Sequence, residues 1–379
     1  MKPLYLDWAA TAMPDTQALT LAFEASTLYF ANIASKHEAG KCASTLYENA
    51  RRTIAAFLTV KPEELIATSG ATEANALVLL SLLQKQKRSG TVLTSSIEHD
   101  SIFKQVQVLE KFGYTVRNVP VNRRGIIEPE TVASLLSDDT VLLAVMAANN
   151  ETGALQPIQD IASILAQHKR PIHFHVDAVQ AFGKLPLTLE GVHSMSFSAH
   201  KIGGPKGFGL LYLHQKKQLT SLFQGGNQER AIRSGTQNLF GMLGCSYALQ
   251  NKNMQEDFLY VSQLANKLLD GLASIPGIVV IPEDRTKNDP SFSPYIMSCA
   301  IPGLTGEVIV RFCSDNDIMI ATGSACSSAH TDRRVLSAMH VEKTIASGAV
   351  RISMGTATQA EDIDALLNTL NDCIKKYKP

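Results

Sequence analysis

The stretch from Met195 to Leu213 reads Met-Ser-Phe-Ser-Ala-His-Lys-Ile-Gly-Gly-Pro-Lys-Gly-Phe-Gly-Leu-Leu-Tyr-Leu. Lys201 lies where an apolar run ends and a glycine-rich turn begins. Glycines let the backbone turn sharply and approach a ligand without a Cβ clash. Ser198 and His200 add a hydroxyl and an imidazole beside the lysine. The stretch therefore predicts a lysine held against a bound ligand at the end of a strand.

Short apolar runs alternate with amphipathic helical stretches on both sides of this lysine. This alternation is typical of a mainly parallel sheet flanked by helices. The predicted strands are 65–68, 92–95, 115–119, 141–147, 173–176, 195–197 and 209–213. The predicted helices are 72–84, 101–112, 129–136 and 158–168.

The pattern changes after about Asn251. A long amphipathic helix over 258–272 precedes a strand over 278–281, and a last helix over 361–377 carries apolar residues at helical spacing. We therefore expect two domains in an α/β chain of 379 residues. A large domain is expected over 13–250, and a smaller α/β domain over 1–12 and 251–379.

Composition narrows the possible partners. Lys plus Arg and Asp plus Glu both number 35, which favours neither nucleic acid nor a membrane surface as a partner. The first residues lack the apolar run of a signal peptide, and no segment approaches the ~18 apolar residues of a membrane span, so we expect a cytoplasmic protein. The six cysteines form no C-x-x-C pair, which argues against a zinc ribbon and predicts no metal site.

Two stretches point to a ligand with an anionic end and a cationic end. Ser69–Asn75 follows a predicted strand and opens a helix, so it is a candidate phosphate site at Thr72; the alternative is a tight turn capped by Thr72. Asp177 ends a strand that is otherwise expected to be buried, and its carboxylate needs a cationic partner such as a protonated pyridine nitrogen. A helix cap or a buried salt bridge is the alternative for Asp177.

Further polar residues follow other strands. His99 and the Asn149–Gly153 stretch also follow strand ends, where open parallel sheets bind ligands, although such residues usually serve turns and caps. Arg351 lies in a β-like segment, and its guanidinium suits either a substrate carboxylate or an internal salt bridge. No nucleotide-binding glycine motif is present.

One cysteine differs from the others. Cys326 lies in the small, polar stretch Thr322–Ser328, which predicts an exposed thiol on a mobile loop of the smaller domain. Four other cysteines are predicted to be buried in the core and inert: Cys245, Cys299, Cys313 and Cys373.

These motifs together resemble the cysteine desulfurases of the class V aminotransferase branch, which are pyridoxal-phosphate enzymes of fold type I. The resemblance covers nearly the whole chain and keeps the order of the family's motifs. The motifs are 5–11, 32–37, 69–75, 98–99, 149–153, 175–180, 198–201, 228–236 and 323–326. Trp8 and Ile33 depart from the residues usual in the family. The resemblance implies a seven-stranded, mainly parallel sheet in the large domain.

The resemblance also implies roles for individual residues. Lys201 would form the Schiff base with pyridoxal 5'-phosphate, Cys326 would be the nucleophile, and His99 would stack on the ring and move protons. The implied cofactor-binding residues are Ala71, Thr72, His99, Asn150, Asp177, Gln180, Ser198, His200 and Lys201, together with Thr236 from the second subunit of a homodimer. The implied substrate-binding residues are Asn32, Asn150 and Arg351.

The activity implied is conversion of L-cysteine to L-alanine with a persulfide on Cys326. The sulfur would pass to an acceptor protein for iron–sulfur cluster assembly or tRNA thiolation. Two alternatives stay open: a related class V enzyme, such as a selenocysteine lyase or an aminotransferase, and a non-catalytic sulfur or metal carrier that uses Cys299, Cys313 and Cys326. The absence of a close cysteine pair disfavours the carrier.

Overall fold

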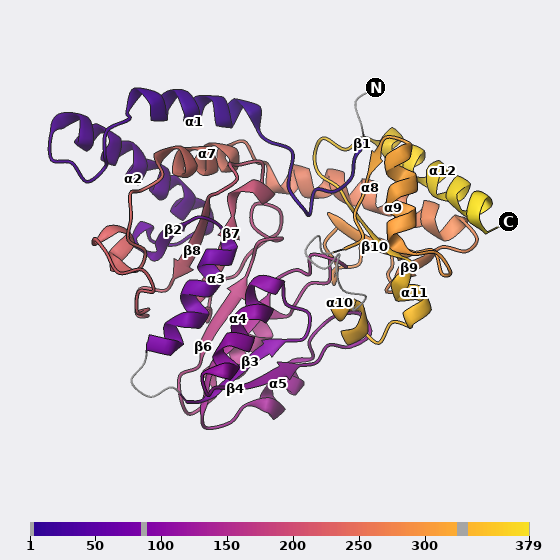
Figure 1. The fold of residues 1–379 in the computed structure, drawn as a ribbon, viewed down its shortest axis with the longest axis horizontal. Coiled ribbons are helices and arrows are strands. Elements are labelled where there is room, and N and C mark those ends of the chain that lie inside the picture. The colour runs from indigo at the N-terminus through magenta and orange to yellow at the C-terminus, as the bar shows by residue number, and fades with distance from the viewer. Residues whose placement is uncertain (1–3, 85–88, 324–332, 379) are drawn as a thin grey trace.

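The computed structural model describes residues 4–84, 89–323 and 333–378. The chain has an α/β fold built on a seven-stranded sheet with helices around it (Figure 1). The sheet has the strand order β2-β8-β7-β6-β5-β3-β4. Its strands are β2 (Leu65–Thr68), β3 (Thr91–Ser95), β4 (Thr115–Val119), β5 (Thr140–Met146), β6 (His173–Asp177), β7 (Ser194–Ser198) and β8 (Gly209–Leu213). All seven strands agree with the sequence prediction to within one residue at each end.

The sheet is parallel except at β8, which runs antiparallel to both β7 and β2. The connection from β7 to β8 holds only a short 3-10 helix, Ala199–Lys201, and a glycine-rich turn. A parallel neighbour would need a crossover of a dozen or more residues. The glycine-rich turn therefore reverses the chain, and it leaves Lys201 at the sheet edge where β5, β6 and β7 end.

Helices cover this sheet. They are α1 (Thr16–Leu28), α2 (Glu38–Leu58), α3 (Ala71–Leu80), α4 (Asp100–Lys111), α5 (Pro129–Leu135), α6 (Ile158–Ala166) and α7 (Leu239–Gln250). The single helix predicted over 72–84 is divided, because α3 ends at Leu80 and a 3-10 helix follows over Ser81–Gln84. The helix α4 begins after His99, whose Nδ1 accepts a hydrogen bond from the amide of Ser101 as the N-cap.

The C-terminal part contains a second sheet of three antiparallel strands, in the order β12-β10-β9. These strands are β9 (Val279–Ile281), β10 (Ile296–Ala300) and β12 (Ala349–Ser353). The accompanying helices are α8 (Met254–Ser274), α9 (Gly306–Asp315), α10 (Arg334–Ala338), α11 (Lys343–Ser347) and α12 (Ala360–Tyr377). Thus α8 and α12 bear out two predicted helices, each slightly longer than or shifted from its predicted bounds.

The two ends of the chain meet. The short strand β1 (Leu4–Tyr5) pairs in parallel with β11 (Ile318–Met319), and Figure 1 shows the indigo N-terminal segment beside the orange C-terminal elements. The amide of Leu6 continues the pairing by donating to Met319 O at 2.9 Å. Residues 7–12 then run from this point toward Lys201, so the N-terminal segment contributes to the edge where the strands end.

The core confirms the cysteine prediction. Cys245, Cys299, Cys313 and Cys373 each have 0% exposed surface. Within the described residues, no helix has the length and apolar character needed to span a membrane.

Candidate active site

A cavity of about 240 Å³ lies where β5, β6 and β7 end and α3 begins. Most of the predicted site residues line it, which confirms that these motifs meet at one sheet edge. They are Ala71, Thr72, His99, Asn150, Asp177, Gln180, Ser198, His200, Lys201 and Arg351. A larger cavity of about 640 Å³ lies elsewhere, mainly among apolar side chains such as Leu185 and Phe258, and none of the predicted residues lines it.

Three predicted residues do not line the 240 Å³ cavity. Asn32 is exposed, and its Oδ1 accepts a hydrogen bond from the amide of Ala34 at 2.9 Å. Thr236 is exposed and lines separate hollows of the surface. Cys326 lies outside the described residues, so its predicted loop is not described.

Lys201 is held by backbone oxygens of the N-terminal segment. Its Nζ donates to Ala9 O at 2.6 Å and to Ala10 O at 2.7 Å. Gln180 Nε2 donates to the same Ala9 oxygen at 3.0 Å, so this carbonyl joins two residues of the cavity. The amine is therefore fixed at the cavity wall by groups that carry no side-chain signature in the sequence.

The N-terminus of α3 provides a site for an anion. Gly70 is its N-cap, and no side chain caps the helix there, so the predicted alternative of a Thr72 cap is wrong. The amide of Ala71 donates to Ser198 Oγ at 3.0 Å, which brings a hydroxyl to the helix N-terminus. Backbone N–H groups and the helix dipole at such an end favour a phosphate.

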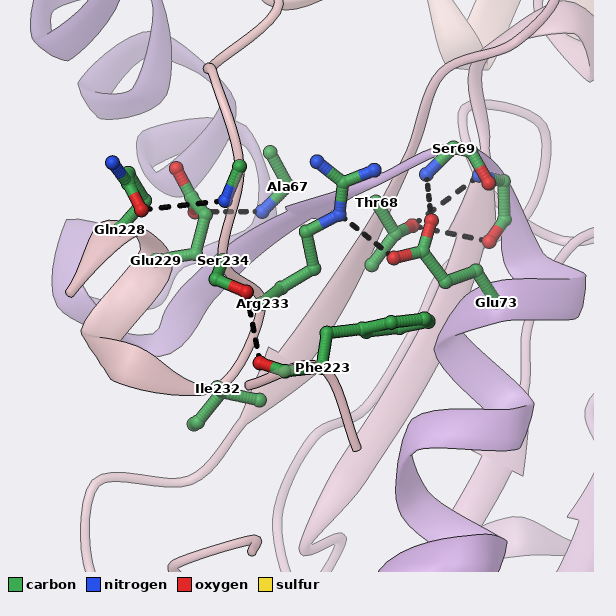
Figure 2. A network of polar contacts seen from close by, with 12 residues as sticks. Ala67, Thr68, Ser69, Glu73, Phe223, Gln228, Glu229, Ile232, Arg233 and Ser234 are labelled. Atoms are coloured by element: carbon green, nitrogen blue, oxygen red, sulfur yellow. Dashed lines mark hydrogen bonds and ion pairs between the residues drawn. The ribbon is translucent and has the colours of Figure 1, made fainter. Parts of the chain in front are cut away.

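Close packing keeps this turn against the sheet. A Cβ on Gly209 would lie 2.5 Å from the Cα of Gly70, so glycine is required where β8 passes the turn. On the other side, Glu73 Oε2 accepts from the amide of Ser69 at 2.6 Å, and Glu73 Oε1 accepts from Arg233 Nε at 2.8 Å (Figure 2). Burial alone raises the pKa of Glu73, but these hydrogen bonds hold it below its usual value.

His200 adds a neutral imidazole beside this end of the cavity. Burial, followed by the charge of Lys201, lowers the pKa of His200 to about 4. Its Nδ1 lies 3.1 Å from the hydroxyl of Thr11. At neutral pH the ring therefore carries a single proton that it can offer to an anion.

Asp177 ends β6 with a buried carboxylate that is 5% exposed. Its Oδ1 accepts from the amide of Val179 at 3.1 Å, and its Oδ2 accepts from Asn75 Nδ2 at 2.9 Å. A carboxylate held in this way can pair with a protonated ring nitrogen in the cavity.

Arg351 forms the internal salt bridge that was predicted as one alternative, and it also lines the cavity. Its Nη2 forms an ion pair with Asp7 Oδ1 at 2.7 Å, and its Nη1 donates to Asn150 O at 2.9 Å. The side chain is 3% exposed and also lines the cavity. The salt bridge predicted as an alternative is present, and the guanidinium still borders the space where a substrate would lie.

Some residues of the site escaped the sequence analysis. The carbonyls of Ala9 and Ala10, the carboxylate of Asp7 and the hydroxyl of Thr11 all come from the 5–11 motif, which gave no individual roles. Asn75 belongs to the 69–75 motif but was not distinguished from a buried helix residue. In the sequence, the only sign of these residues was that they lie within the two motifs. What each one contacts depends on neighbours that are distant in the chain.

The fold and the site define the class of protein. The profile of the class V aminotransferases matches residues 4–366, and the chain belongs to that family. Within the family, the chain is similar to cysteine desulfurases. It is 34% identical to the cysteine desulfurase NifS of Azotobacter vinelandii, over 100% of this chain and 94% of the relative.

Two further comparisons agree. The chain is 35% identical to a NifS/IcsS protein homolog of Lactobacillus delbrueckii subsp. bulgaricus, over 99% of this chain and 98% of the relative. A solved structure of a NifS-like protein superimposes with a TM-score of 0.91 at 33% identity, covering 99% of this chain and 100% of the other. These likenesses confirm the predicted fold type I architecture.

Pyridoxal phosphate is the cofactor of this family, and the groups around the cavity fit it. The cofactor has an aldehyde, a ring nitrogen and a phosphate. The cavity offers the amine of Lys201, the buried carboxylate of Asp177, and a helix N-terminus with the hydroxyl of Ser198. Each reactive part of the cofactor thus has a chemically matched group.

Proposed function

We propose that the chain is a pyridoxal-phosphate-dependent cysteine desulfurase that converts L-cysteine to L-alanine and collects the sulfur as a persulfide on Cys326. The observation that carries the proposal is the cavity that unites Lys201 with the carboxylate of Asp177 and the N-terminus of α3. The full-length similarity to cysteine desulfurases supports the choice of reaction.

Lys201, Asp177 and the residues around α3 would hold the cofactor. Lys201 would supply the amine for the aldehyde, and Asp177 would keep the ring nitrogen protonated. The phosphate would lie at the start of α3 beside Ala71 and Thr72, where Ser198 and His200 would also hold it. When bound, pyridoxal phosphate withdraws electrons from the substrate's α-carbon, which makes its proton acidic.

The remaining residues act on the substrate. Arg351, with Asn32 and Asn150, binds the carboxylate of L-cysteine through its planar guanidinium. His99 and the amine of Lys201 accept and return protons. The carbonyls of Ala9 and Ala10 hold that amine at the cavity wall.

The thiolate of Cys326 would attack the sulfur of the bound substrate, so an S–S bond forms as the substrate's C–S bond breaks. The bonding pair stays with the substrate's β-carbon, which takes up a proton to become the methyl group of alanine. A thiolate is required, because the thiol is a poor nucleophile. Burial raises the pKa of Cys245, Cys299 and Cys313 to about 12, which disfavours this role for them. The same burial argues against a carrier that uses Cys299 and Cys313.

Several finer statements belong to this proposal. The active unit is a homodimer in which Thr236 reaches the phosphate of the other subunit. Residues 13–250 form the large domain, and 1–12 with 251–379 form the smaller one. The sulfur passes to an iron–sulfur scaffold or a tRNA-thiolation protein, and the enzyme is cytoplasmic.

The test is incubation with L-cysteine and a reductant, followed by measurement of alanine and sulfide. Equal amounts of both products are expected from the wild type, and none from Cys326→Ala. Cys42→Ala is the matched control and should keep the wild-type rate, because Cys42 does not line the cavity. A wild-type rate in Cys326→Ala would refute the assigned role, and a keto acid in place of alanine would indicate an aminotransferase.

A further inference from the structure

Asn75 is a fully buried residue of α3 whose amide makes three side-chain hydrogen bonds. Its Nδ2 donates to Asp177 Oδ2 at 2.9 Å and to Ser101 Oγ at 2.8 Å. Its Oδ1 lies 2.8 Å from Nε2 of His175. Since Ser101 belongs to α4 while His175 and Asp177 belong to β6, this one amide joins three elements at the cavity.

The chemistry of the partners fixes the direction of the hydrogen bonds that Asn75 makes with Asp177 and His175. A carboxylate only accepts hydrogen bonds, so the NH₂ of Asn75, and not its oxygen, faces Asp177. His175 must then donate from Nε2 to Asn75 Oδ1, and its Nδ1 accepts from Ser194 Oγ at 2.8 Å. Burial lowers the pKa of His175 to about 3, so this ring is neutral and has one proton, on Nε2.

The other branch leads to His99. Ser101 Oγ accepts from Asn75, so its own proton is available for His99 Nδ1 at 2.9 Å. The amide of Ser101 also donates to that nitrogen, at 3.1 Å. Because two donors face Nδ1, a neutral His99 carries its proton on Nε2.

We propose that Asn75 is a positioning residue that holds the Asp177 carboxylate and fixes the ring of His99 at the same time. The inference rests on the proposed function, because Asp177 and His99 are the groups assigned to the cofactor's ring nitrogen and to proton transfer. Asn75 couples the two through one amide, so neither group can change its hydrogen bonding without affecting the other.

The substitution Asn75→Asp separates this role from packing. Aspartate has nearly the same shape and can still accept from His175, but its carboxyl cannot supply both donors. It also places a second carboxyl beside Asp177, and two carboxylates at that distance cannot both ionise readily. Loss of hydrogen bonds to buried partners predicts a dissociation constant for pyridoxal phosphate that rises about tenfold to a hundredfold.

Ser101→Ala cuts only the branch to His99. Its cofactor dissociation constant should stay within about twofold of the wild type, while kcat for L-cysteine falls about tenfold. Val78→Ala is the structural control, because Val78 is buried in α3, the helix that carries Asn75, and has no polar group. This control should lower the thermal midpoint and leave both constants near the wild type.

The measurements use the full-length protein: cofactor affinity by fluorescence titration, kinetics of the loaded enzyme, and nitrogen-15 NMR of labelled histidines. NMR is expected to show His99 with its proton on Nε2. Wild-type cofactor affinity in Asn75→Asp would overturn the role toward Asp177. Wild-type kcat in Ser101→Ala, or a proton on Nδ1 of His99, would overturn the role toward His99.

If Asn75→Asp does not fold, Asn75→Ala replaces it with the same expectation, since it adds no charge. Cofactor affinity and NMR need no substrate. Failure of the wild type to form alanine would therefore refute the proposed function without deciding the role of Asn75.

Discussion

The substitution Glu229→Gln tests how a buried ion pair holds the segment that carries Thr236. Glu229 has a side chain that is 2% exposed, and it accepts hydrogen bonds from both terminal nitrogens of Arg51, at 2.8 and 2.9 Å. It also accepts from the hydroxyl of Tyr47 at 2.9 Å and from the amide of Ala67 at 2.8 Å, and Figure 2 shows it close to Ala67. One carboxylate thus ties this segment to α2 and β2.

The expected loss of stability in Glu229→Gln follows from the charge of Arg51, which stays buried after its partner is removed. Removing one partner of a buried ion pair costs about 3–5 kcal/mol, because the remaining charge is buried without its counter-charge. Glu48 lies 3.3 Å from Arg51 Nε and partly compensates, so the lower value, about 3 kcal/mol, is expected. The double variant Arg51→Met with Glu229→Gln removes both charges and keeps an acceptor for Ala67, so it should lose less than Glu229→Gln alone.

Urea unfolding followed by circular dichroism, at one fixed protein concentration, measures these differences. Cofactor titration of the same variants should show weaker binding in Glu229→Gln, because Thr236 is predicted to reach a phosphate in the other subunit. A double variant that is less stable than Glu229→Gln would refute the reasoning, and so would a loss below about 1 kcal/mol in Glu229→Gln.

Gly209→Ala places a Cβ 2.5 Å from the Cα of Gly70, so it should weaken cofactor binding by at least about tenfold in a fluorescence titration; unchanged affinity would contradict the close packing of the phosphate turn. Gly355→Ala places a Cβ 2.2 Å from the ring of Trp8, the only tryptophan, and should shift its emission to the red at a cost of about 1–3 kcal/mol; an unchanged spectrum would speak against that contact. Burial raises the pKa of Glu98 to about 8 from 4.5, so the folded state binds more protons between these pH values, and the residue's contribution to stability falls by about 1.4 kcal/mol per pH unit as pH rises. Glu98→Gln should remove that pH dependence, measured as the difference in unfolding free energy between pH 6 and pH 7 in urea. The same difference in the wild type and the variant would show that Glu98 is ionised in the folded protein.

The large sheet could be predicted because its strands are short apolar runs between helices of clear periodicity. All five residues of strands such as β3 and β7 are buried, so sequence and environment agree. In the second sheet, β10 was missed: Ile296–Ala300 includes a serine and a cysteine and follows a polar loop, so its pattern is weak. Its burial comes from pairing with β12 and β9, which are distant in the sequence.

The sequence predicted those residues of the cavity whose side chains are reactive and follow the end of a strand, such as Lys201, Asp177 and His99. It was not predicted where the acting group is a backbone oxygen. The carbonyls of Ala9 and Ala10 reach Lys201 across about 190 positions, and no residue pattern marks a carbonyl. The sequence also did not identify Asp7 as the partner of Arg351, because the two residues lie near opposite ends of the chain.

The pairing of β1 with β11 has a consequence for the order in which the protein is made. Leu4 meets Ile318, and the two are 314 positions apart. At ~5–20 residues per second, a ribosome adds that length in roughly 15 to 60 s. Throughout this time the N-terminal segment has no strand to join, and Lys201 emerges before its backbone acceptors can be fixed. We therefore expect cofactor loading to wait for synthesis of the C-terminal strands, which hold the N-terminal segment through β11 and supply Arg351 from β12.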